Sequence, residues 1–224
     1  MSLAIFNGSP RGIKSNSSVI ASWFLNGYKD THTIFYLNKI KCHSEYLNKA
    51  SQFNEYLFVM PLYVDGMPAQ VKLFFESMSL YQEHFKEKKI TFIIHSGFNE
   101  GIHNRSLEKY LNNFASIMNM KNWGIIILPG SEGFRLMPDK MTKRKNKILT
   151  FLGRNYMENK PYNLSFLNQL IRKEINSKKE IILFKLLSKL GLTNVYWNRT
   201  LKKNNAFKKR FDAPYSNSPF KEKG

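Results

Sequence analysis

Residues 5–17 read Ile-Phe-Asn-Gly-Ser-Pro-Arg-Gly-Ile-Lys-Ser-Asn-Ser and separate two apolar patterns of different period. The apolar run at residues 3–6 is typical of a short buried strand. Apolar residues then recur at helical spacing over residues 19–24, and Ser15 or Asn16 is well placed to cap that helix. The sequence therefore predicts a strand, a polar loop and a helix in succession.

The polar loop between these elements suits an anion. The first amides of a helix have no partner inside the helix, and the helix dipole adds partial positive charge there. The hydroxyls of Ser9, Ser15 and Ser17 and the side-chain amide of Asn16 are able to donate to phosphate oxygens, and either Arg11 or Lys14 could neutralise the charge. The glycine spacing matches neither a Walker loop nor a dinucleotide fingerprint. A capping turn without a ligand is the alternative interpretation.

The rest of the chain repeats the alternation of strand and helix. Further apolar, strand-like runs occupy residues 33–37, 56–60, 90–95 and 123–128. Helical patterns follow at 71–78, 107–117 and 139–157, while residues 43–52 are consistent with a short helix or a loop. Buried parallel strands joined by right-handed helical crossovers form an open sheet with helices on both faces. We therefore expect an α/β fold with a doubly wound, five-stranded parallel sheet.

Three loops stand out because each follows a predicted strand. They comprise residues 8–16, 61–67 and 96–101. The carboxyl ends of parallel strands meet at one edge of the sheet, and ligands of such folds bind beyond that edge. The sequence therefore predicts one shared site built from these three loops.

The same loops carry a family resemblance. Gly8-Ser9-Pro10-Arg11 followed by Ser15-Asn16-Ser17 resembles the phosphate loop of the flavodoxin-like, NADPH-dependent FMN reductases. The segment 61–69 is similar to their flavin-ring loop, and His95-Ser96-Gly97-Phe98 with Glu100 is similar to their third loop. Trp197, Lys202-Lys203-Asn204 and Ala213-Pro214-Tyr215 are similar to the C-terminal segment of some members. The chain departs from the family pattern at Asn99, where proline is usual, and in having fewer glycines after the fifth strand.

This resemblance implies a flavodoxin-like fold that binds FMN without a covalent bond and accepts hydride from NADPH or NADH. Electrons would pass to a small acceptor such as a quinone, a nitro compound or free flavin. The resemblance assigns the following residues to FMN: Ser9, Arg11, Ser15, Asn16, Ser17, Pro61, Leu62, Tyr63, Val64, Asp65, Gly66, Ser96, Gly97 and Phe98. We name no catalytic side chain, because the cofactor carries the redox chemistry. A flavodoxin-type electron carrier without NAD(P)H activity is the alternative.

Composition adds a second alternative, a basic nucleic-acid-binding protein, and it excludes several kinds of site. The 224 residues include 35 Lys and Arg against 16 Asp and Glu, and the net charge of +19 attracts anionic partners in general. No recognisable nucleic-acid-binding motif is present, so we expect at most weak, salt-dependent binding to nucleic acid. The single cysteine, Cys42, excludes an internal disulfide. The five histidines show no metal-binding spacing, so no metal site is predicted.

We expect two parts, an FMN-binding domain at 1–160 and a basic helical extension at 161–224. The extension contains a strongly apolar helical stretch, 181–190, flanked by lysines and ended by Gly191. We expect it to pack on its own domain or on a partner subunit in a homodimer, and a membrane surface is the alternative. The start of the chain lacks the basic region of a signal peptide, and no apolar run is long enough to span a bilayer. These features predict a soluble, cytoplasmic protein.

Overall fold

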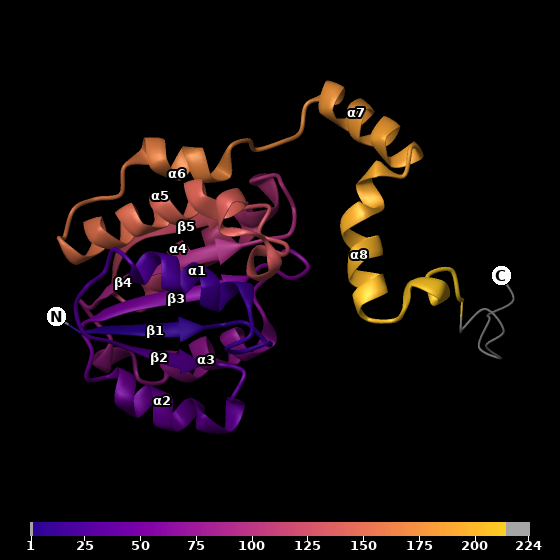
Figure 1. Cartoon of the computed structure of the whole chain (residues 1–224). Helices are drawn as coiled ribbons and strands as arrows, with labels where there is room; N and C mark the ends of the chain where they lie inside the picture. Colours follow the sequence, from indigo (N-terminus) through magenta and orange to yellow (C-terminus); the bar gives the residue numbers. More distant parts are fainter. Residues whose placement is uncertain (1, 214–224) are drawn as a thin grey trace, which may run out of the picture. The chain divides into compact units, whose positions relative to one another are not determined.

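The computed structural model describes residues 2–213 and divides the chain into two compact units, Met1–Ile175 and Asn176–Gly224 (Figure 1). Within residues 2–213, the first unit contains the sheet and six α-helices, and the second contains two α-helices.

The first unit is built on five parallel strands in the order β2-β1-β3-β4-β5. The strands are β1 (Leu3–Asn7), β2 (His32–Tyr36), β3 (Glu55–Pro61), β4 (Lys89–His95) and β5 (Lys121–Leu128). Every residue of β1, β3 and β4 is buried, as expected for strands covered on both faces. The predicted doubly wound sheet is confirmed, and its strand order is that of the flavodoxin-like fold.

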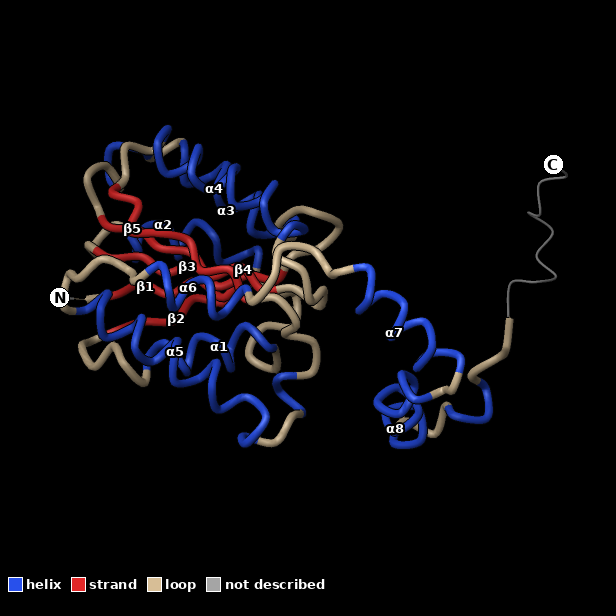
Figure 2. The backbone as a smooth tube through the Cα atoms, turned by 90° about the horizontal axis from the view of Figure 1, so that it is seen from above, coloured by secondary structure: helices blue, strands red, loops and turns tan. Residues whose placement is uncertain are grey.

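Helices cover both faces of this sheet (Figure 2). Alternate residues of β1 enter different cores, with Phe6 on one face and Ile5 on the other. The Phe6 core includes residues of α2 (His43–Ala50), α3 (Ala69–Ser79) and α4 (Arg105–Ile117). The Ile5 core includes residues of α1 (Asn16–Leu25), α5 (Asp139–Met157) and α6 (Leu164–Ile171). The polar loop therefore leads into a helix that is held firmly on the Ile5 side.

The backbones of α1 and α5 approach each other closely at two glycines. A Cβ atom added to Gly153 would lie 2.0 Å from the carbonyl oxygen of Phe24, and one added to Gly27 would lie 1.8 Å from that of Thr150. These distances leave no room for a side chain at either position. The contact fixes α1, and with it the loop that precedes α1.

The first unit extends beyond the predicted boundary at residue 160 and includes α6. Leu170 of α6 is buried in the Ile5 core. The segment after α6 is then held against the loop that follows β4, because the amide of Gly101 donates to the carbonyl of Lys173 at 2.9 Å. Arg105 also forms an ion pair with Glu174. These contacts explain why the division falls after Ile175.

The second unit contains α7 (Lys178–Lys189) and α8 (Val195–Lys203). The apolar stretch expected to be helical is α7, which begins with a capping box between Ser177 and Glu180. Gly191 follows it in the left-handed region at φ 71°. Among the described residues, no helix combines the length and apolar character needed to cross a membrane. Pro214 and Tyr215 of the C-terminal family pattern lie outside the described residues.

Candidate functional site

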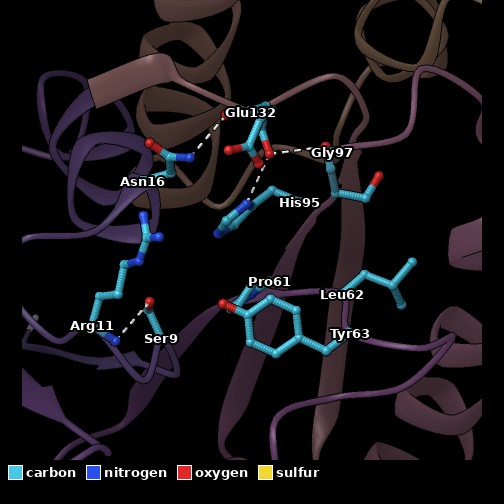
Figure 3. Close-up of a pocket in the computed structure, with 11 residues that line it drawn as sticks. Ser9, Arg11, Asn16, Pro61, Leu62, Tyr63, His95, Gly97 and Glu132 are labelled. Carbon is cyan, nitrogen blue, oxygen red and sulfur yellow. Dashed lines mark hydrogen bonds between the residues drawn. The ribbon is translucent and has the colours of Figure 1, made fainter. Parts of the chain in front are cut away.

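A cavity of about 170 Å³ lies where the three predicted loops meet at the carboxyl edge of the sheet (Figure 3). A fourth loop, after β5, completes its wall. The lining residues are Ser9, Arg11, Asn16, Pro61, Leu62, Tyr63, His95, Ser96, Gly97, Ser131 and Glu132. The convergence expected of a parallel sheet is therefore present in the structure.

Asn7, the last residue of β1, organises the loop that follows it. Its side-chain oxygen accepts from the amide of Ser9 at 2.9 Å, and its side-chain nitrogen donates to the hydroxyl of Ser18 at 2.8 Å. The Ser15 hydroxyl donates to the carbonyl of Gly12 at 2.6 Å and accepts from the Ser18 amide at 3.2 Å, as an N-cap does. The side chains of Asn7 and Ser15 therefore stabilise the loop through hydrogen bonds inside it.

The backbone at the start of α1 is left with open donors. Within residues 2–213, the amides of Ser15, Asn16 and Ser17 have no hydrogen-bond acceptor. These donors lie at the positive end of the α1 dipole, which is the arrangement that binds phosphate. Arg11, an exposed residue that also lines the cavity, adds a positive charge beside them. The loop can therefore bind an anion through backbone and Arg11.

The side chain of Asn16 joins two loops that are far apart in the sequence. Its nitrogen donates to the carbonyl of Ser131 at 3.0 Å (Figure 3). Its oxygen accepts from the amide of Arg135 at 3.0 Å. Both ends of the amide group are therefore used inside the protein. Asn16 shapes the cavity by tying the loop after β5 to the start of α1.

His95, at the end of β4, joins three of the loops. Its Nδ1 lies 2.9 Å from the Ser131 hydroxyl, and its Nε2 lies 2.7 Å from the Ser17 hydroxyl. The Ser131 hydroxyl donates its hydrogen to the carbonyl of Ser96, so Nδ1 of His95 must carry the proton that reaches Ser131. Nε2 then accepts from Ser17. Burial lowers the pKa of His95 to about 3, so the ring is neutral and is held in one tautomer.

The loop after β3 contains a tight turn between Tyr63 and Gly66. Each of these two residues donates its amide to the carbonyl of the other, at 2.9 and 3.0 Å. Val64 and Asp65, between them, adopt φ angles of 47° and 58°, a region that branched side chains rarely enter. Tyr63 lines the cavity, whereas Val64 is 99% exposed. The turn therefore presents one aromatic ring to the cavity and one aliphatic side chain to solvent.

Part of the set of residues predicted to bind FMN lies together in the structure. Eight predicted residues line the cavity: Ser9, Arg11, Asn16, Pro61, Leu62, Tyr63, Ser96 and Gly97. The hydroxyls of Ser15 and Ser17 are buried and hydrogen-bonded within the protein. Val64, Asp65 and Gly66 belong to the turn, and Phe98 stacks on His103 with ring centres 4.3 Å apart.

Three lining residues, His95, Ser131 and Glu132, were not predicted. The sequence contained a signal for the last two, because the segment 129–133 follows the fifth strand and must emerge at the same edge. His95 closes the strand before the third loop, but its role depends on partners in two other loops. Among the described residues, no group of His, Cys, Asp or Glu side chains is arranged to hold a metal ion.

Comparisons with known proteins place the fold. No family model matches the sequence, and no curated protein does so either. Three solved structures resemble 68–70% of this chain. The Trp repressor binding protein from Bacillus subtilis has a TM-score of 0.53 at 19% identity, and 96% of it is covered. The FMN-dependent NADH-azoreductase from Bacillus anthracis, solved with FMN, has a TM-score of 0.56 at 16% identity and is covered over 100% of its length. The NAD(P)H:quinone oxidoreductase from Methanothermobacter marburgensis has a TM-score of 0.56 at 16% identity, with 96% covered.

These likenesses confirm the fold that the sequence predicted. The matched proteins are covered almost completely, whereas about a third of this chain has no counterpart in them. They include proteins of the kind that the loop motifs of this sequence resemble.

Proposed function

We propose that this protein is an FMN-dependent oxidoreductase that takes hydride from NADPH or NADH and passes electrons to a small acceptor. The observation that carries the proposal is the set of open amides at residues 15–17, at the start of α1, where Asn16 lines the cavity at the carboxyl edge of the sheet together with Arg11. This arrangement suits a phosphate group. The fold neighbours that act with FMN and NADH, or on quinones with NAD(P)H, support the redox reaction.

The residues present fit FMN in a specific way. The amides of residues 15–17, with Ser9 and Arg11, would hold the phosphate, so Ser15 and Ser17 would contribute backbone and not hydroxyl groups. Leu62 and Tyr63 would contact the flavin ring, and the backbone of Ser96 and Gly97 would lie at its polar edge. Bound FMN supplies the two-electron redox chemistry, and the chain binds, orients and shields it.

His95 has a positioning role in this proposal. With its pKa lowered to about 3, the ring does not gain or lose a proton near neutral pH. The ring is hydrogen-bonded to Ser17 at the start of α1 and to Ser131 in the loop after β5. It would thereby fix the distance between these two segments on either side of it. Proton exchange with an acceptor would then involve solvent or other groups.

Two further features of the proposal concern assembly and location. We propose that the protein is a homodimer, as the family resemblance implies, and that it acts in the cytoplasm, as the features of its sequence predict. Light scattering or analytical ultracentrifugation at micromolar concentration should report the mass of two chains. A monomeric mass across that range would remove the dimer from the proposal and leave the redox function untouched.

The function itself is tested by flavin binding followed by reduction. Adding the purified protein to FMN should quench flavin fluorescence, and anaerobic addition of NADPH or NADH should then bleach the bound flavin. Absence of FMN binding would overturn the proposal. Binding without bleaching by either dinucleotide would support the alternative of an electron carrier. If bleaching occurs, reoxidation by quinones, nitro compounds and free flavin ranks the acceptors.

A further inference from the structure

The second unit carries a large apolar surface on α7. Its exposed side chains include Ile182 at 66%, Leu186 at 55% and Leu190 at 65% exposure. Of the side chains that the structure describes in residues 176–213, none is buried. This unit therefore has no core of its own within its described part, and its apolar face requires another surface.

Lysines lie beside this face along α7. At about 100° per residue, Lys178, Lys185 and Lys189 fall on one side of the helix. Leu183, Leu186 and Leu190 fall on another side, about a third of a turn away, and Lys179 falls on that side too, at the first turn of the helix. Lysine stems can lie along an apolar surface while their charged ends remain in water. The helix therefore offers an apolar strip bordered by positive charge.

Net charge distinguishes among the surfaces that could cover this strip, namely the first unit, a second copy of the chain and a lipid surface. Residues 176–224 contain 12 basic and 3 acidic residues, and the other 175 residues contain 23 basic and 13 acidic residues. The first unit and any second copy of the chain therefore carry the same sign of charge as the strip. An anionic lipid surface has the opposite sign, and its acyl region accepts leucine side chains.

We propose that the second unit docks on an anionic lipid surface, with α7 lying in the interface. The aromatic and basic residues beyond α7 fit this partner. Trp197 of α8 is 55% exposed and Phe211 is 83% exposed. The guanidinium of Arg210 lies 4.1 Å from the ring centre of Phe207 and 4.6 Å from that of Phe211. Aromatic rings and basic groups together are typical of the region between lipid headgroups and acyl chains.

Vesicle flotation with the full-length protein tests this inference. The protein should float with vesicles of phosphatidylcholine containing about 30 mol% phosphatidylserine, and not with phosphatidylcholine alone. Leu183→Gln with Leu186→Gln should remove flotation, because both apolar contacts are lost. Lys185→Gln with Lys189→Gln should lower the vesicle affinity by about five-fold per lysine, with a stronger loss at high salt.

Matched controls come from exposed residues of the first unit. Lys143→Gln with Lys147→Gln removes the same charge from α5, and Leu80→Gln with Leu164→Gln removes two other exposed leucines. Both control variants should float like the parent protein, and all variants should keep the parent's solution mass and helical content.

Four results would overturn the inference. They are equal binding to neutral and anionic vesicles, equal losses in the control variants, an α7 leucine variant that still floats, and an α7 leucine variant that changes solution mass. The third result would indicate a general surface for polyanions such as RNA. The last would show that a second copy of the chain covers α7.

Discussion

The two edges of the sheet both gather polar groups, but the groups do different things: at the amino edge buried side chains pair with one another, and at the carboxyl edge side chains support a row of backbone amides. At the amino edge, the ammonium of Lys89 contacts the Glu55 carboxylate at 3.2 Å, the carbonyl of Tyr156, and Asn159 at 2.8 Å. Tyr28 donates to the other oxygen of Glu55 at 2.7 Å. All three hydrogens of Lys89 are therefore used.

At the carboxyl edge, by contrast, the polar side chains of Asn7, Asn16 and His95 are satisfied while the amides of residues 15–17 are not. The side chains there serve to hold a row of backbone donors in place. A buried polar cluster with every partner present contributes to stability, whereas open backbone donors at a helix start are available to an anionic ligand. Variants at the two edges should therefore affect different measurements.

The largest effect is expected at the amino edge. Lys89→Met would leave the buried Glu55 carboxylate without its cation, and we expect the free energy of unfolding to fall by about 3–5 kcal/mol. Urea denaturation measures this change. FMN affinity, measured below the unfolding transition, should remain that of the parent. Adding Glu55→Gln to Lys89→Met should recover part of the stability, and a weakened FMN affinity in the single variant would contradict the separation of the edges.

The next effect depends on pH and arises at the carboxyl edge. The pKa of His95 is lowered to about 3 in the folded protein, against about 6.5 in an unfolded chain. The unfolded state therefore binds the extra proton first as pH falls. Stability from the neutral ring is complete above pH 6.5 and is lost by about 1.4 kcal/mol per unit as pH falls from there toward 3. Urea denaturation at several pH values should show a shallower acid loss in His95→Asn than in the parent. The exposed His32→Asn variant should keep the parent's slope.

Removing the Arg11 cation beside the open amides should weaken FMN binding without lowering the stability of the fold. We expect Arg11→Gln to lower FMN affinity by about tenfold, because one charge-assisted contact to phosphate is lost. Lys14→Gln is the matched control, since Lys14 is an exposed cation of the same loop that does not line the cavity. Fluorescence titration measures both variants. Equal weakening by the two substitutions would mean that general positive charge, and not Arg11 itself, attracts FMN.

The smallest effect distinguishes the role of the Ser15 hydroxyl from that of the Ser15 backbone amide. Ser15→Ala removes the N-cap of α1 and should cost about 1 kcal/mol of stability. FMN affinity should stay within about threefold of the parent, because the amide at position 15 is retained. A tenfold or larger loss of affinity with unchanged stability would place the hydroxyl on the phosphate instead of on the helix cap.

Local sequence patterns predict the strands, the helices α1, α3, α4 and α5 that follow them, and the edge at which the main loops meet. Apolar runs and helical spacing are local patterns, and a parallel sheet necessarily brings the carboxyl ends of its strands to one side. Ser9, Arg11 and Tyr63 could be placed at the cavity for this reason. The length of the first unit could not, because the packing of Leu170 depends on residues far away in the sequence.

The packing of distant loops, in contrast, determines which polar groups are used internally and which stay open. Asn16 binds the loop after β5, and Ser17 binds His95 at the end of β4. Neither partner can be predicted from the sequence around position 16 or 17, since the pairing depends on the separation of three loops set by the sheet and by the α1–α5 contact. The sequence therefore predicts a polar loop suited to an anion, and in the folded chain its hydroxyl and amide side chains support the loop while the backbone amides of residues 15–17 stay open.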